Sequence, residues 1–421
     1  MQTNSQTPPY RRNMVLLLCG RLVSSLMTQA FIFAQGLYVM DLTGSAAAFS
    51  AVLIAAMIPR AIFNFFAGVL VDRLDQKKLI VGCDLAMGLV IFGFLALFLQ
   101  YPKSLTLFIV LSLVLGAVNT LFVIAVQTAT PHMVGDKLVL KTNALQQSMK
   151  SLIFILGPVL GALSYGYSGM KGVFILNGIS FFLSGVSEMM IRFRARRSDG
   201  ASGVLESFRQ VWQYFGANPV LKSLFMVAIA MQAFFEPMVT LVLPFVAYKI
   251  LEVSEFQLSL IQGLASLGVI LAGLILATRK NKGAYLHYFF VLLIIQGVLF
   301  VGWSFPALAR QTVLSAWVLT GVFTLLQFLG RFFNTIQNVP LFSHFQVAVP
   351  EEIRGRVFGF FYSVTFMVVP VSLWLFGFLL ETIDWVWIPI IAGGVVILIA
   401  VVFMSKSDLR LWLKQIRDEG Q

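Results

Sequence analysis

Four of the charged residues inside long apolar stretches of the chain are the first candidates for chemistry, because lipid or protein rather than water would surround them. Glu236 directly precedes Pro237 near the middle of one stretch, and no other acidic residue is placed so centrally. Arg21, Arg60 and Arg331 occupy three further stretches. A charged side chain at the centre of a bilayer costs at least about 2.5–3.5 kcal/mol, so each of these residues needs a chemical reason to be there.

Glu236 has two interpretations. A carboxyl group at this depth can exchange a proton, so it is a candidate for coupling transport to protons or for recognising a cation. Alternatively, it is the structural partner of a buried arginine. Arg21 and Arg331 are placed where they can extend toward the predicted cytoplasmic side. Arg60, at the centre of its stretch, is instead a candidate for selecting an anionic substrate.

The composition indicates that lipid covers much of the chain. Of its 421 residues, 59% are hydrophobic and only 11% are charged, whereas about a quarter are charged in soluble domains. A helix needs about 20 mostly apolar residues to cross a membrane. We therefore predict an all-α integral membrane protein with about twelve transmembrane helices. The predicted spans are 14–39, 46–70, 79–100, 105–127, 144–166, 172–190, 222–248, 255–277, 285–304, 313–337, 356–380 and 385–404.

Basic residues alternate between the connections of these spans. Counted from the N-terminus, 22 of the 30 Lys and Arg residues fall in every second connection or at the first residue of the span that follows it, and only four fall in the other connections. This asymmetry predicts that both termini and the central loop lie in the cytoplasm, as in a multi-pass protein of the inner membrane. It also explains the net charge of +12 without nucleic acid as a partner.

The longest connection, residues 191–221, divides the chain into two halves. Its second half, Val204 to Phe215, has the spacing of a short amphipathic surface helix. We predict two pseudo-symmetric six-helix bundles, an architecture found in many secondary carriers. The predicted parts are a cytoplasmic N-terminus (1–13), an N-terminal bundle (14–190), the cytoplasmic loop (191–221), a C-terminal bundle (222–404) and a cytoplasmic tail (405–421).

The connection between the second and third spans carries a recognisable motif. It reads Gly68-Val69-Leu70-Val71-Asp72-Arg73-Leu74-Asp75-Gln76-Lys77-Lys78. This resembles the loop signature of the major facilitator superfamily, Gly-x-Leu-x-Asp-Arg-x-Gly-Arg-Lys-x, with Asp75 in place of the usual Gly. The glycine permits close helix approach, and the Asp-Arg pair can form charge-assisted hydrogen bonds at a helix end. Asp84, early in the third span, is a further expected partner.

Other stretches resemble one branch of that superfamily, the macrolide-efflux and enterobactin-exporter group of bacterial drug:proton antiporters. They are residues 42–46, 143–145, 156–161 and 349–359, so the resemblance extends over nearly the whole chain. It implies the major facilitator fold, export and coupling to protons.

Gly157, Pro158 and Gly161 also resemble the end of the fifth-helix antiporter motif, although Ile153 and Ala162 replace glycines of the family pattern. A Gly-Pro pair suits either a moving interface or simple helix packing. The fourth span, Gly116 to Thr120 included, lacks the arginine motif of proton-coupled drug carriers.

These observations predict a monomeric secondary transporter that exports a lipophilic drug or small metabolite by alternating access, with Glu236 exchanging a proton. An alternative is a major facilitator carrier of an anionic metabolite, siderophore, peptide or lysolipid. An integral-membrane enzyme or a transport-dead sensor is disfavoured, because no His, Asp and Ser residues cluster at a membrane face. We expect no cofactor or metal, because the three histidines form no cluster and no phosphate-binding glycine loop is present. Cys19 and Cys83 are interpreted as small core residues.

Overall fold

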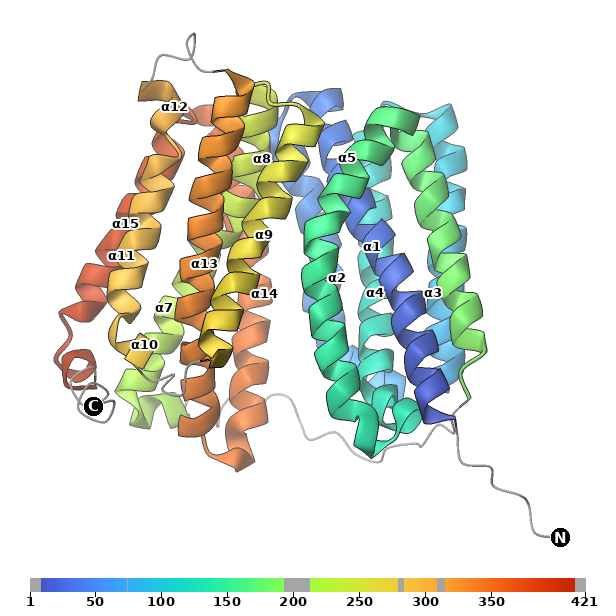
Figure 1. Cartoon of the computed structure of the whole chain (residues 1–421), viewed down its shortest axis with the longest axis horizontal. Coiled ribbons are helices and arrows are strands. Elements are labelled where there is room, and N and C mark those ends of the chain that lie inside the picture. The colour runs from blue at the N-terminus through green and yellow to red at the C-terminus, as the bar shows by residue number, and fades with distance from the viewer. Residues whose placement is uncertain (1–8, 74, 193–212, 279–283, 309–314, 413–421) are drawn as a thin grey trace. The chain divides into compact units, whose positions relative to one another are not determined.

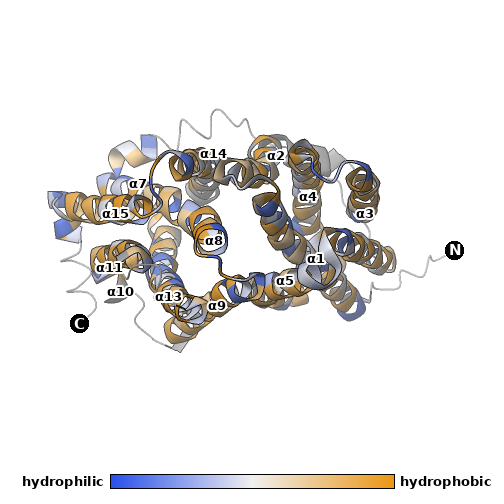
Figure 2. Cartoon of the chain, turned by 90° about the horizontal axis from the view of Figure 1, so that it is seen from above, coloured by the Kyte–Doolittle hydropathy of each residue, from blue (hydrophilic) through white to orange (hydrophobic). Residues whose placement is uncertain are grey.

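The computed structural model describes residues 9–73, 75–192, 213–278, 284–308 and 315–412 (Figure 1). Every regular element in these ranges is a helix. The predicted surface helix between Val204 and Phe215 falls largely outside the described residues. Residues 213–217, which are described, are helical. Hydrophobic residues, coloured orange, dominate the helices in the view from above (Figure 2).

Five long helices form the first part of the chain. They are α1 (Tyr10–Thr43), α2 (Ala46–Arg73), α3 (Gln76–Gln100), α4 (Leu105–Val134) and α5 (Asp136–Met189). Helix α5 breaks at Gly169, whose φ of 63° and ψ of −175° are not helical. Glycine adopts this conformation at little cost because it has no Cβ atom. The break separates two helical segments where the sequence predicts the fifth and sixth spans.

The second part of the chain contains the remaining helices. They are α7 (Pro219–Pro237), η1 (Met238–Val242), α8 (Leu243–Phe245), η2 (Val246–Ile250), α9 (Glu255–Thr278), α10 (Ala284–His287), α11 (Phe289–Gly302), α12 (Phe305–Leu308), α13 (Ala316–Ala348), α14 (Glu351–Thr382) and α15 (Trp387–Met404). Elements α7 to η2 run on from one another as a single rod, so they correspond to one predicted span.

The predicted all-α membrane class is confirmed. Within the described ranges, nine helices are long and apolar enough to cross a bilayer, and shorter apolar helices lie at 46–60 and 367–382, within α2 and α14. Because α5 contains two of the predicted spans, each of the twelve predicted spans has a helix. The helices run further than predicted, as α1 does at both ends, because hydropathy marks only the part that lipid covers.

Contacts divide the chain into two compact units. Unit 1 comprises Met1–Thr43 and Ala51–Ala201, and unit 2 comprises Gly44–Ser50 and Ser202–Gln421. The first residues of α2 group with unit 2 because the hydroxyl of Ser45 donates a hydrogen bond to the carboxylate of Glu381 on α14. The backbone N–H of Ala47 donates to the same carboxylate at 3.1 Å.

The helices inside each unit pair in the same order. In unit 1, α3 packs against α5, and in unit 2, α11 packs against α15; these are the third and sixth predicted spans of each half. A Cβ atom added to Gly297 of α11 would lie only 2.7 Å from the carbonyl oxygen of Gly393 on α15. Small residues that bring two backbones together are typical of packing between membrane helices.

The second and fourth spans of each half are also in close contact. In unit 1, a Cβ atom at Gly116 of α4 would lie 2.6 Å from the carbonyl oxygen of Ala56 on α2. In unit 2, Gly268 of α9 approaches the carbonyl oxygen of Phe328 on α13 in the same way. Both units therefore use a glycine at this crossing, which agrees with the pseudo-symmetry of the two bundles predicted from the sequence.

Candidate transport site

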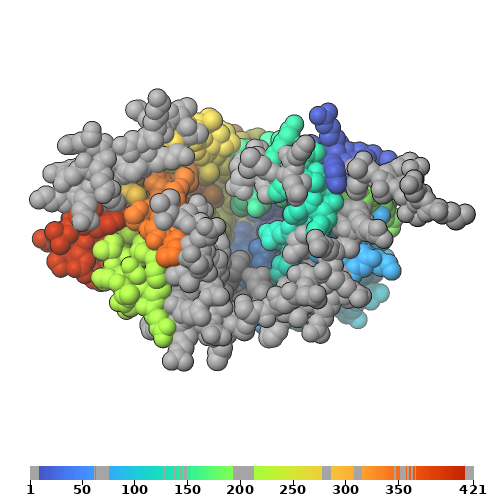
Figure 3. All heavy atoms as spheres, turned by 90° about the horizontal axis from the view of Figure 1, so that it is seen from below, coloured from blue at the N-terminus to red at the C-terminus, as the bar shows by residue number. Residues whose placement is uncertain are grey.

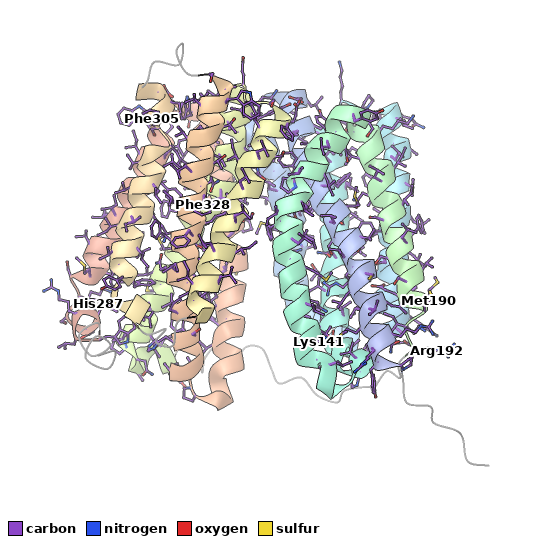
Figure 4. The ribbon with its side chains drawn as sticks, in the orientation of Figure 1. Lys141, Met190, Arg192, His287, Phe305 and Phe328 are labelled. Carbon is purple, nitrogen blue, oxygen red and sulfur yellow. The ribbon has the colours of Figure 1, made fainter. Side chains whose placement is uncertain are left out.

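Glu236 and Arg331 come together in unit 2. Glu236 is near the middle of the rod formed by α7 to η2, and Arg331 is near the middle of α13, less than one turn beyond Phe328 (Figure 4). The two side chains are half-buried and interact electrostatically. Arg331 is thus the electrostatic partner of Glu236, and it lies deeper along its helix than the predicted span 313–337 suggested.

The backbone beyond Glu236 departs from a regular α-helix. Pro237 has no backbone N–H to donate, and the hydroxyl of Thr240 donates a hydrogen bond to the carbonyl oxygen of Glu236 at 2.8 Å. Residues 238–242 and 246–250 then form two π-helical turns. Such wide turns occur frequently at functional sites. Sequence reasoning did not foresee them, and Pro237 is the one signal that marks their position.

A stripe of polar side chains follows the same face of α13. Gln327, Arg331, Asn334 and Asn338 recur at the three- and four-residue spacing that aligns side chains along a helix. Asn338 donates a hydrogen bond to Asn334 at 2.9 Å, and Asn334 donates to Gln296 of α11 at 3.2 Å. Gln296 in turn donates to Gln337. This chain of amides fixes α13 against α11.

Two donors of the stripe remain unused. The Nε2 atom of Gln327 and the Nε atom of Arg331 are buried and have no hydrogen-bond partner among the described residues. A buried donor without an acceptor costs about 1–3 kcal/mol. The two residues lie about one turn apart on α13, and Arg331 interacts electrostatically with the Glu236 carboxyl group. This arrangement can hold a proton on Glu236 and offer two donors to an acceptor group of a ligand.

A second group of buried charges lies in unit 1. Arg21 of α1 interacts electrostatically with Asp84 of α3 and Glu188 of α5. Its guanidinium also lies 5.7 Å from the centre of the Phe122 ring. The sequence analysis placed Arg21 where it could extend toward the cytoplasmic side and treated Asp84 as a partner of the loop signature. The structure brings Arg21 and Asp84 together within unit 1; a partnership of Asp84 with the loop signature stays a prediction, because the side chains of Asp72 and Arg73 are outside the described residues.

Glu188 was missed because it is two residues from the end of the predicted span 172–190, close to the basic loop. An acid in that position usually reaches water, yet only 1% of Glu188 is exposed. A signal was available, because Asn177, Ser180, Ser184 and Ser187 form a polar stripe at helical spacing along the same segment. Such a stripe indicates a face that packs against other helices.

The loop signature is described only in part. The backbones of Gly68, Asp72 and Arg73 lie in the last turns of α2, and their side chains are outside the described residues. Asp75 begins α3, and its carboxylate accepts hydrogen bonds from the backbone N–H groups of Lys77 at 3.0 Å and Lys78 at 3.1 Å. The residue that departs from the signature is therefore an N-cap, for which Asp is a preferred type.

The helix-five motif packs against α1. A Cβ atom at Gly157 would lie 2.5 Å from the Cγ atom of Gln29, and one at Gly161 would lie 2.6 Å from the carbonyl oxygen of Ala30. Both glycines are thus required for the close approach of α1 and α5, whose lower ends appear in Figure 3. Pro158 lies between them, inside α5. Packing accounts for this geometry; a role in movement stays a prediction.

The remaining candidates are dispersed. Arg60 follows Pro59 in α2, its side chain is exposed, and no opposite charge acts on it among the described residues. Cys83 is buried as predicted, but Cys19 is exposed on α1, so its interpretation as a core residue was wrong. The sequence could not distinguish the buried face of α1 from the exposed one, because lipid accepts apolar residues as readily as a protein core does.

The sequence matches the model of the Major Facilitator Superfamily over residues 17–346. The chain belongs to this superfamily and is a multi-pass membrane transporter rather than an enzyme. It is 22% identical to macrolide efflux protein A of Streptococcus pyogenes, over 92% of this chain and 93% of that protein. It is 24% identical to the multidrug efflux pump Tap of Mycobacterium tuberculosis, over 86% of this chain and 85% of that pump.

Solved structures show the same fold at low identity. The POT family transporter PepTSo aligns with a TM-score of 0.72 and 11% identity, over 97% of this chain and 99% of that one. A bacterial homologue of the iron transporter ferroportin, in its inward-facing state, aligns with a TM-score of 0.67 and 15% identity, over 94% and 99% of the two chains. Together with the family match, these likenesses agree with the two six-helix bundles predicted from the sequence.

Proposed function

We propose that this transporter exports a lipophilic drug or small metabolite in exchange for protons, and that Glu236 binds the coupling proton. The observation that carries the proposal is the placement of Glu236 and Arg331 near the middle of two helices of unit 2, where the two charges interact electrostatically. The names of the efflux relatives support the direction of transport. Alternating access, both termini in the cytoplasm of an inner membrane, and a monomeric state complete the proposal.

The interaction of Glu236 with Arg331 provides a physical basis for the exchange of a proton for the cargo. When Glu236 is ionised, Arg331 offsets part of the cost of burying its charge, and the carboxylate can still attract a cationic group or a hydrogen-bond donor of the cargo. A proton on Glu236 removes that attraction. A proton and a cargo that both bind the Glu236 carboxylate exclude each other, so binding of one promotes release of the other. The π-helical turns beyond Pro237 place this carboxyl group beside an irregular part of its helix.

The polar stripe of α13 supplies recognition. The unused donors of Gln327 and Arg331 suit a cargo that carries carbonyl, hydroxyl or ether oxygens on an apolar frame. A buried donor that gains an acceptor recovers the cost of its earlier desolvation. Binding sites of this kind are mostly apolar, with a few convergent polar groups that fix orientation.

A second candidate function is transport of an anionic metabolite. The exposed guanidinium of Arg60, with no opposite charge acting on it among the described side chains, favours this alternative. An anion that binds Arg60 would be a different cargo from a lipophilic drug, so the two candidates predict different substrates. A panel that includes a macrolide, cationic dyes and organic anions distinguishes them.

The experiment compares Glu236→Gln with the unchanged protein in inside-out vesicles, with and without a proton gradient. Glu252→Gln is the matched control, because Glu252 is an exposed acid of the same unit. We expect Glu236→Gln to abolish transport driven by the gradient while the protein stays inserted, and the control to transport normally. Gradient-driven transport of any cargo at an unchanged rate in Glu236→Gln would refute the role of Glu236. Transport of organic anions alone would replace the leading candidate with the second.

A further inference from the structure

Two carboxyl groups lie completely inside unit 1. Asp84 is 0% exposed and Glu188 is 1% exposed. None of their four oxygen atoms has a hydrogen-bond partner of good geometry among the described residues, although the hydroxyl of Ser184 lies beside Asp84. Ser184 itself accepts a long hydrogen bond of 3.4 Å from Ser24. Buried carboxylates are normally held by several donors, so these two need another explanation.

Charge balance supplies it. Arg21 interacts electrostatically with both carboxyl groups, and the carboxyl groups act on each other. If both were ionised, one guanidinium would face two negative charges, leaving one buried charge without compensation. An uncompensated ion inside a protein costs several kcal/mol. A single proton removes the excess, because one neutral carboxyl group and one carboxylate then face one guanidinium.

Among the described residues, Arg21 is the one basic group that acts electrostatically on the pair. Arg11 and Arg12 of α1 and Arg192, just after α5, are exposed, and Lys77 and Lys78 are in the first turn of α3. Helix α3 adds the buried thiol of Cys83, which the two acids also influence. Helix α4 contributes the Phe122 ring, and its one titratable residue, His132, is in its last turn. In α5, the nearest basic residue in sequence to Glu188 is Lys171, at the opposite end of the segment after Gly169. Among the described residues, no group of three or more His, Cys, Asp or Glu side chains suits a metal ion.

Glu188 is also close to one end of the unit. It lies in the last turn of α5, beside Met190 and Arg192 at the end where α1 begins (Figure 4). The side chain of Asn13 joins the helices there, donating hydrogen bonds to the carbonyl oxygens of Met133 at 2.9 Å and Arg192 at 2.7 Å. Glu188 is therefore close to the end of unit 1 for which the sequence predicts the cytoplasmic side.

We propose that Asp84 and Glu188 form a second proton-binding site, which holds one proton between the two carboxyl groups beside Arg21. The transporter then has one protonatable site in each unit. Because the two carboxyl groups share one guanidinium, the proton belongs to the pair rather than to either residue. This inference does not depend on the role proposed for Glu236 or on the identity of the cargo.

Infrared difference spectroscopy of the full-length protein in liposomes tests the proposal. The protein carries Glu236→Gln, so that this residue cannot contribute, and the C=O stretching band of protonated carboxylic acids is followed between acidic and alkaline pH. We expect one band from the site. It should be lost when either Asp84→Asn or Glu188→Gln is added, and the combination of both should remove nothing more. Adding Glu252→Gln, the exposed control, should leave the band in place.

Isotope labelling provides a measurement that requires no change at the site. In the Glu236→Gln protein, carbon-13 in the side-chain carboxyl group of aspartate, or separately of glutamate, should shift part or all of the same band. A band that persists in both Asp84→Asn and Glu188→Gln refutes the site. A band that shifts with only one label, or that is lost in only one variant, refutes a shared proton. These results leave the transport test of Glu236 unaffected, so the two proposals fail separately.

Discussion

Replacing Arg21 by Gln should destabilise unit 1 far more than removing either of its acidic partners. The change leaves Asp84 and Glu188, at 0% and 1% exposure, without their guanidinium. Removing one partner from a buried charge pair costs about 3–5 kcal/mol. By contrast, Asp84→Asn leaves one guanidinium facing one carboxylate, a balanced pair, so its cost should stay below about 1 kcal/mol.

The penalty of Arg21→Gln should depend on pH. Both carboxyl groups of the variant must take up a proton to remain buried, so the folded variant binds more protons than its unfolded chain. Stability then falls as pH rises, because the slope of the unfolding free energy with pH follows the difference in bound protons. The cost should be largest in alkaline buffer and should shrink as pH decreases.

The assay is equilibrium unfolding of the purified variants in mixed micelles at several pH values. Arg60→Gln is the matched control, since Arg60 is an exposed arginine of the same unit on which no opposite charge acts among the described residues. The double variant Arg21→Gln with Asp84→Asn should regain part of the lost stability. The reasoning is refuted if Arg21→Gln costs no more than Arg60→Gln, or if Asp84→Asn costs as much as Arg21→Gln.

Two further predictions concern packing and topology. Gly116→Ala should destabilise the protein by about 1–3 kcal/mol in the same unfolding assay, because its Cβ atom would lie 2.6 Å from the carbonyl oxygen of Ala56. The control is Gly93→Ala, which should not destabilise the protein, because no atom lies within 4 Å of its Cβ atom. Equal effects of the two substitutions would contradict the reasoning. In a protein whose native cysteines have been replaced, Lys103→Cys should react with an impermeant thiol reagent added outside intact cells, whereas Lys406→Cys should react only after permeabilisation. The reverse pattern would overturn the proposed orientation.

The spans were predictable because lipid imposes a simple requirement on each of them. About 20 apolar residues mark a crossing wherever they occur, so even the division of α5 at Gly169 was anticipated as two spans. Element boundaries were less predictable, because helices such as α1 continue into polar residues on both sides. The π-helical turns after Pro237 leave no trace in hydropathy.

The charge partners were harder to predict than the charges themselves. Glu236 and Arg331 were both identified from the sequence, since a charge in an apolar run is conspicuous. Which acid meets which arginine depends on the order in which helices pack, and Arg21 was therefore not assigned to the acids that it meets. Glu188 shows the same limit, because its position near a span end gave no sign of how deeply α1 and α3 cover it.

The contact of Gly297 with Gly393 has a mechanical consequence. Side chains usually accommodate the movement of one helix along another, because they can change rotamer as the helices slide. Between α11 and α15 the main chains of Gly297 and Gly393 are in contact, and only the side chains of Val301 and Ile397 beside them can rearrange. We therefore expect these two helices to move together as one body, and bending in unit 2 to occur in other segments, of which the wide turns after Pro237 are the least regular.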